Sequence, residues 1–257
     1  MAEQTITMRR LVLAAGVALG AALPLRPAQA AETFTPPKGC SLFLTVQMHG
    51  CLVSNHYTCN ADPKGDKWRV DFNQNGPFFV SKIDTETQWI ETYDLAAGTH
   101  ETLRPHAPNP ASFSELLAKG IDSYDFSTAT DQGKVTHVTG YDKLTGVKRV
   151  VNGVTLEQSE FDTTAKDDKG NQVWHSKGHE WISRNWRLFL AGAGTWEDET
   201  GKTPFDNSPV VMSQPGQKGF GSMTPEFDCN SVESQLVLPP QGPVFPLVAS
   251  TAMGRAG

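Results

Sequence analysis

Histidines are the residues of this chain whose spacing first suggests chemistry. His175 and His179 lie four positions apart, and Glu180 follows directly. On a helix this spacing would place both imidazoles on one face, where they could hold a metal ion. The flanking residues 173–174 and 181–182 instead indicate a strand, in which positions four apart are separated by about 13 Å. We therefore predict that this motif holds no metal, and no cofactor motif occurs elsewhere.

All four cysteines lie between positions 40 and 229. An even number of cysteines in an exported chain indicates two disulfides. If residues 49–50 form a two-residue hairpin turn, Cys40 faces Cys59, and Cys51 is left to pair with Cys229. The alternative pairing is Cys51–Cys59 with Cys40–Cys229.

The same hairpin register makes further predictions. Leu42 should face Tyr57, and Val46 should face Val53. His56 would point away from the side that carries Val53 and Tyr57, so we expect it to be exposed.

Two other kinds of site are weaker hypotheses. Cys51, His56 and Cys59 could contribute to a zinc site, but their spacing matches no zinc template and an oxidising compartment favours disulfides. A Ser–His–Asp triad would have to assemble from residues that are distant in sequence, because the chain lacks the Gly-x-Ser-x-Gly elbow.

Aromatic side chains are the better indication of a binding site, since the chain has six tryptophans. Small-molecule sites are usually concave and lined by apolar and aromatic side chains. We predict such a groove, lined by Trp68, Trp89, Tyr93, Leu116 and Leu117. The alternative interpretation is that these side chains fill the core of a curved sheet.

Short β-rich runs bounded by Gly, Asp and Asn dominate the chain, and many of them alternate apolar and polar residues. The predicted strands are Ser41–Met48, Leu52–Thr58, Lys67–Phe72, Pro77–Asp84, Thr87–Leu95, His100–Arg104, Tyr124–Thr128, Lys134–Asp142, Val147–Val151, Val154–Thr163, Gln172–Ser176, Glu180–Leu190 and Val210–Met212.

One short helix interrupts the strands. Asn109-Pro110 can supply its N-cap and first helical residue, and Gly120 its C-terminal stop. Phe113, Leu116 and Leu117 form a small apolar face, which suits a plug or lid.

A sheet of this many strands must curl, close or split. The fold class we predict is mainly β: a curved antiparallel meander, half-open and barrel-like, with one short helix and stabilising disulfides. This order of elements resembles the half-open barrels of periplasmic lipoprotein carriers in architecture, although no sequence motif carries the likeness. A closed barrel and a β-sandwich are the alternatives.

The N-terminus has the features of a cleavable signal peptide. Arg9-Arg10 precede an apolar run over residues 11–23, which is shorter than the ~20 residues of a membrane span. An Ala-x-Ala site at residues 28–30 predicts cleavage after Ala30. Export would follow the general secretory or the twin-arginine route, to the periplasm or the medium.

We expect three segments: a signal peptide over residues 1–30, one β-rich domain over 31–235 and a flexible Pro-rich tail over 236–257. The chain has a net charge of −6 and no cluster of basic residues, which argues against nucleic acid as a partner. The expected function is the binding or carriage of a small apolar ligand. Contact with an envelope protein and hydrolysis at a dispersed site are the alternatives.

Overall fold

The computed structural model describes residues 33–229. The predicted signal peptide and Pro-rich tail therefore lie outside the described residues. Within residues 33–229 the chain forms one antiparallel sheet of 13 strands and one short helix, with two disulfides. No helix in that range is both long and apolar enough to cross a membrane.

The elements are β1 (Cys40–Met48), β2 (Leu52–Cys59), β3 (Lys67–Asn73), β4 (Gly76–Ile83), β5 (Trp89–Asp94), β6 (Thr99–Leu103), α1 (Phe113–Lys119), β7 (Ile121–Thr130), β8 (Val135–Val151), β9 (Val154–Asp167), β10 (Gln172–Ser183), β11 (Leu188–Asp198), β12 (Gly201–Asp206) and β13 (Pro209–Ser213).

The strands follow chain order across the sheet, except that β13 pairs with β1. β12 and β13 are thus the two edges, and they are not hydrogen-bonded to each other. Only Asn207 and Ser208 separate these edge strands in the chain, so the edges meet at one corner. The predicted half-open meander is confirmed, whereas the closed barrel and the sandwich were wrong.

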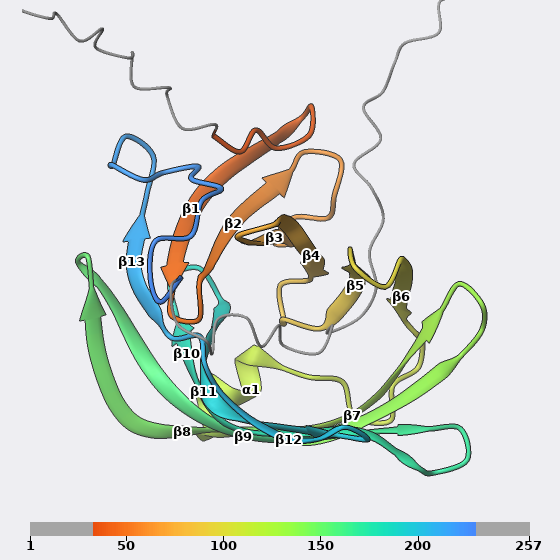
Figure 1. Ribbon diagram of the computed structural model, residues 1–257. Coiled ribbons are helices and arrows are strands. Elements are labelled where there is room, and N and C mark those ends of the chain that lie inside the picture. The colour runs from red at the N-terminus through yellow and green to blue at the C-terminus, as the bar shows by residue number, and fades with distance from the viewer. Residues whose placement is uncertain (1–32, 230–257) are drawn as a thin grey trace, which may run out of the picture. The chain divides into compact units, whose positions relative to one another are not determined.

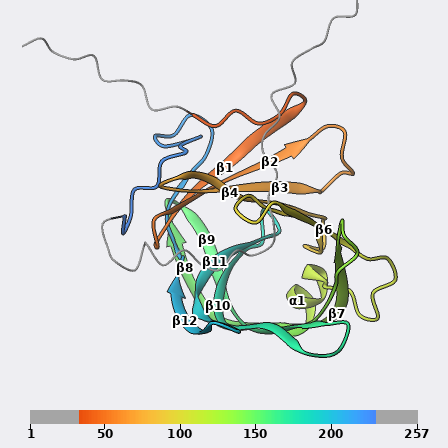
Figure 2. The same ribbon diagram turned by 45° about the vertical axis from the view of Figure 1, so that its right-hand side comes forward.

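The sheet bends around its own concave face. Strands β7–β12 form a bowed trough, β1–β6 lie across from it, and α1 lies inside the trough (Figures 1 and 2). Gly178 on β10 pairs with Gly194 on β11. A Cβ at either position would overlap the backbone of the other strand, so this part of the sheet requires glycine.

The convex face of β1–β3 is covered by two segments, residues 33–39 and 214–229. The backbone N–H of Phe34 donates to the carbonyl of Gly221, 2.7 Å away, and joins the two segments. Phe34 and Met223 pack against an apolar cluster that contains Tyr57 and Phe72. Both faces of these strands are therefore buried.

The β1–β2 hairpin confirms part of the predicted register. Leu42 pairs with Tyr57, as expected, but Val46 pairs with Ser54 and not with Val53. The difference arises because a bulge at Phe43 adds one residue to β1. The turn accordingly has three residues, 49–51.

Several predicted boundaries were wrong. β8 and β10 continue through Gly146 and Gly178, where we expected the strands to end. β11 extends to Asp198 and β12 follows it, in a segment that was expected to be loop. Pairing with neighbouring strands keeps both glycines within the sheet. Gly146 lies in a bulge of β8, and Gly178 lies opposite Gly194.

The helix begins three residues later than predicted. Ser112 is its N-cap and accepts a hydrogen bond from the backbone N–H of Glu115, and Gly120 ends it in the left-handed conformation with φ 79°. Asn109 instead exchanges backbone hydrogen bonds with Asp125 of β7.

We predict that peptide mapping without reduction will recover Cys40–Cys59 and Cys51–Cys229, the pairs that the structure contains. Replacing both Cys51 and Cys229 with Ser should lower the free energy of unfolding by about 3–5 kcal/mol, because that bond closes the longer loop. Chemical denaturation measures the change. The matched Cys40→Ser/Cys59→Ser variant should lose less, and recovery of a Cys51–Cys59 peptide would contradict the assignment.

Candidate functional site

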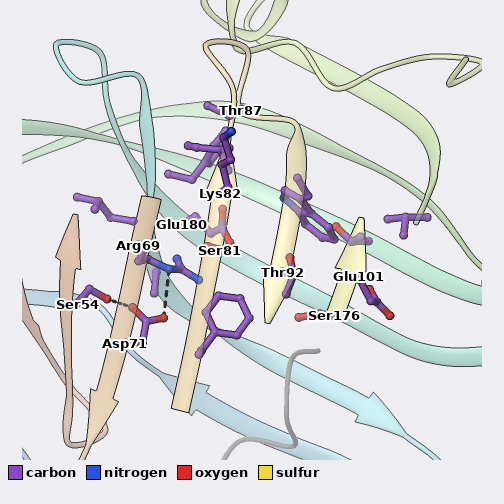
Figure 3. Close-up of a pocket in the computed structure, with 18 of the residues that line it drawn as sticks. Ser54, Arg69, Asp71, Ser81, Lys82, Thr87, Thr92, Glu101, Ser176 and Glu180 are labelled. Carbon is purple, nitrogen blue, oxygen red and sulfur yellow. Dashed lines mark hydrogen bonds and ion pairs between the residues drawn. The ribbon is translucent and has the colours of Figure 1, made fainter. Parts of the chain in front are cut away.

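The concave face of the sheet encloses a cavity of about 520 Å³. This volume lies within the usual range of small-molecule pockets, roughly 300–1,000 Å³. Polar side chains from β2–β6 lie on one side of it, with residues of β10 behind them (Figure 3). The labelled residues are Ser54, Arg69, Asp71, Ser81, Lys82, Thr87, Thr92, Glu101, Ser176 and Glu180.

Two aromatic pairs form apolar parts of the wall. Trp174 and Trp196 stack with ring centroids 4.8 Å apart. Trp89 and Phe126 meet edge to face at 5.3 Å. All four side chains line the cavity. They give it flat apolar surfaces on which the body of a small molecule could pack.

Arg69 is fixed against the wall of β3 and β4. Its Nε lies 3.1 Å from a carboxylate oxygen of Asp71, and its guanidinium stands over the ring of Phe79 at 4.9 Å. The hydroxyl of Ser54 donates to Asp71. Burial raises the pKa of Asp71, although Arg69 and Ser54 act in the opposite direction.

Three more carboxylates line the cavity from the trough side: Asp122 of β7, Asp142 of β8 and Glu180 of β10. Asp122 and Asp142 are direct cross-strand partners. Like charges directly opposite each other destabilise a sheet. Asp122 accepts a hydrogen bond from the backbone N–H of Ser112. The side chains of Asp142 and Glu180 accept none from a residue within 33–229.

These carboxyl groups hold protons more tightly than usual. Burial raises the pKa of Glu180 from 4.5 to about 7, against the opposing effect of Arg69. Burial, together with the charges of Glu180 and Asp122, raises the pKa of Asp142 well above its ordinary value. Glu180 therefore changes charge near neutral pH, and its charge in turn raises the pKa of Asp142.

His56 also lines the cavity and is 3% exposed, so the prediction that it would be exposed was wrong. It does point away from Tyr57, but that direction leads into the concave face and not to solvent. Burial and the nearby Arg69 lower the pKa of His56 to about 3, and the imidazole is therefore neutral. Its Nε2 atom has no hydrogen-bond partner among the described residues.

The predicted aromatic site residues are divided between two faces. Trp89 lines the cavity. Trp68 contributes to the cavity wall, but its indole stacks on Tyr57 and Tyr93 and donates to Asp62. Tyr93 stacks on His100 and does not line the cavity. Tyr57, Trp68, Tyr93 and His100 form a stacked series on the face of β2–β6 that points away from the cavity.

Leu116 and Leu117 lie in a separate apolar cluster and do not line the cavity. Leu116 is fully buried beside Phe113 and Ile182, and Leu117 packs at the edge of this cluster. The ring of Phe113 contacts Phe189, which does line the cavity, at 5.5 Å. The helix thus supports one end of the site through Phe113.

Hydrogen bonds to Glu86 also hold the helix, in addition to its apolar contacts. Glu86 accepts from the hydroxyls of Ser112 and Ser114 and from the backbone N–H of Ser114. Arg187 donates to the same carboxylate at 2.7 Å. A helix fixed this way is better suited to a stationary end wall than to a lid.

The remaining histidines do not form a catalytic group in the cavity. His175 contacts Asp162 at 2.8 Å, on the face of β10 opposite to Ser176. Ser127 and His137 lie 2.8 Å apart, but both are on the convex face of β7 and β8. Within residues 33–229 no group of three His, Cys, Asp or Glu side chains is placed to hold a metal ion.

The charged residues of the cavity were not among the site residues predicted from the sequence. Asp122 shares a strand face with Tyr124 and Phe126, and a carboxylate in phase with apolar residues was a detectable signal. Arg69 and Asp71 gave no such signal, because they alternate with the apolar Trp68, Val70 and Phe72 and look solvent-facing. Only the tertiary structure places that polar face inside.

Comparisons with known proteins give no family. No protein-family model matches the chain, and no curated protein or solved structure matches it either.

The pKa of Glu180 leads to a prediction about stability. Because its folded-state pKa is raised, the folded protein binds more protons than the unfolded chain between pH 4.5 and about 7, and stability falls as pH rises through that window. Glu180→Gln should therefore increase the free energy of unfolding by about 1–3 kcal/mol at pH 8 and by much less at pH 5. Urea denaturation at both pH values tests this. Glu160→Gln, at an exposed ion pair with Lys143, is the control and should change little at either pH.

A second prediction separates the two leucines of the helix. Leu116→Ala should lower the free energy of unfolding by about 2–5 kcal/mol, because it removes a fully buried side chain. Leu117→Ala should cost clearly less, since Leu117 is only partly buried. Equal losses in thermal or chemical unfolding would contradict this description of the helix.

Proposed function

We propose that this chain is a non-enzymatic binding or carrier protein that holds a small amphipathic molecule in the cavity of its half-open sheet. The observation that supports the proposal is the cavity of about 520 Å³, whose walls carry two aromatic pairs and several charged side chains. A large, mostly apolar pocket with a few convergent polar groups is the usual form of a ligand site.

The composition of the walls favours an amphipathic guest over a purely apolar one. Asp142 and Glu180 face the cavity without hydrogen-bond donors from the described residues. Buried polar groups without partners are costly, so a guest that supplies donors would be bound more tightly than a hydrocarbon.

Both disulfides are consistent with export to an oxidising compartment. We propose that the protein acts in the periplasm or outside the cell. Action through an envelope partner without a ligand is the alternative that the following experiment separates from carriage.

The test is uptake of N-phenylnaphthylamine, an uncharged dye whose fluorescence rises in apolar surroundings. Wild-type protein should bind it saturably. Thr92 lines the cavity, so Thr92→Trp should fill part of the space and weaken binding by about tenfold or more.

The matched control is Thr102→Trp, which places the same side chain on the opposite face of β6, since Glu101 faces the cavity. It should leave dye affinity within about twofold of wild type. If wild-type protein takes up no dye at any concentration, carriage is wrong and the accessory-protein hypothesis replaces it.

A further inference from the structure

The trough side of the cavity carries three carboxyl groups for which the described residues provide no basic partner. Asp122, Asp142 and Glu180 line it, and no lysine or arginine within residues 33–229 forms an ion pair with any of them. Arg69 is the cation that acts on Glu180, but its ion pair is with Asp71. A buried carboxylate without a partner is unfavourable in the empty protein.

The positions of these residues in the sheet place the three carboxyl groups on one face of the trough, on β7, β8 and β10. Asp122 and Asp142 are paired across β7 and β8. Asp142 pairs with Phe161 of β9, and Phe161 pairs on its other side with Gly178 of β10. Glu180 lies two positions after Gly178, so its side chain points to the same face of the sheet. Asp142 is only 9% exposed. A compact positive group between the carboxylates would relieve their mutual repulsion and provide both with a hydrogen-bond donor.

A second observation, independent of the carboxylates, also indicates a ligand with donors. His56 is buried, neutral and lines the cavity, and its Nε2 lacks a partner among the described residues. With its proton on Nδ1, the imidazole would accept a hydrogen bond through Nε2. The stacked Trp174 and Trp196 add aromatic surface, which attracts cations as well as apolar groups.

We propose that the ligand is an amphipathic organic amine. Its ammonium group lies between Asp142 and Glu180, beside Asp122, and its apolar body packs against the aromatic pairs of the wall. This inference rests on the proposed binding function and names the chemical class of the guest.

The test compares three probes that share a dodecyl chain and differ in the head group: dodecylamine, dodecanol and dodecanoate. Each competes with bound N-phenylnaphthylamine at pH 8, below its micelle concentration. The amine should displace the dye at a concentration at least about tenfold lower than dodecanol, and dodecanoate should be the weakest. Equal displacement by the amine and the alcohol overturns the inference but leaves the carrier function standing.

A charge-matched pair of variants shows where the preference arises. In Asp142→Asn/Glu180→Gln the advantage of the amine over dodecanol should fall to about twofold or less, while dodecanol binding is retained. The control, Glu160→Gln/Asp162→Asn, removes two carboxylates from the convex face of β9 and should keep the advantage. If both double variants keep it, amine binding is a surface charge effect and the inference is wrong.

The remaining outcomes are also decisive. Preference for dodecanoate would assign the head group to Arg69 and overturn the amine. If none of the three probes displaces bound dye, this inference fails and the carrier function stands; if the dye itself does not bind, both fail. Should the double variant not fold, the comparison of the three head groups on wild-type protein still decides the question.

Discussion

The cavity exists because one continuous sheet has to cover its own concave face. In a sandwich a second sheet would do so, and in a closed barrel the opposite strands would. Here the described part of the chain supplies only α1, a helix of seven residues, and its apolar side chains are used against Ile182 and Phe189. The part of the concave face that α1 leaves uncovered lines the cavity.

The convex face of β1–β3, in contrast, is covered. Residues 33–39 and 214–229 pack on it through polar as well as apolar contacts. Thr45 donates to Asn55, and the amide of Asn55 donates to the carbonyl of Ser222 in the covering segment. Gln47 exchanges hydrogen bonds with the same segment at Thr224 and Glu226. With the Cys51–Cys229 bond these contacts fix residues 214–229, so β1 and β2 are held from outside and their other face is left to line the cavity.

The charges in the cavity reduce the stability of the empty protein. Raised pKa values of Asp142 and Glu180 mean that ionising them costs free energy in the folded state. Apolar side chains of similar size would fill the same positions at lower cost. Binding sites often retain such unfavourable groups, because a guest that compensates them is bound selectively.

The sequence by itself determined the mainly β class, the meander order and the short helix, and it left two disulfide pairings open, of which the structure contains Cys40–Cys59 with Cys51–Cys229. The class, the order and the helix follow from local periodicity and turn residues, which act over a few residues. The tertiary structure decided which strand faces look inward. Alternation puts Trp68 and Arg69 on opposite faces, but it cannot say which face is the cavity when both are buried. The covering segment settles that question for β1–β3, and the bend of the sheet (Figure 1) brings Arg69, Asp142 and Glu180 around one cavity from strands far apart in the chain.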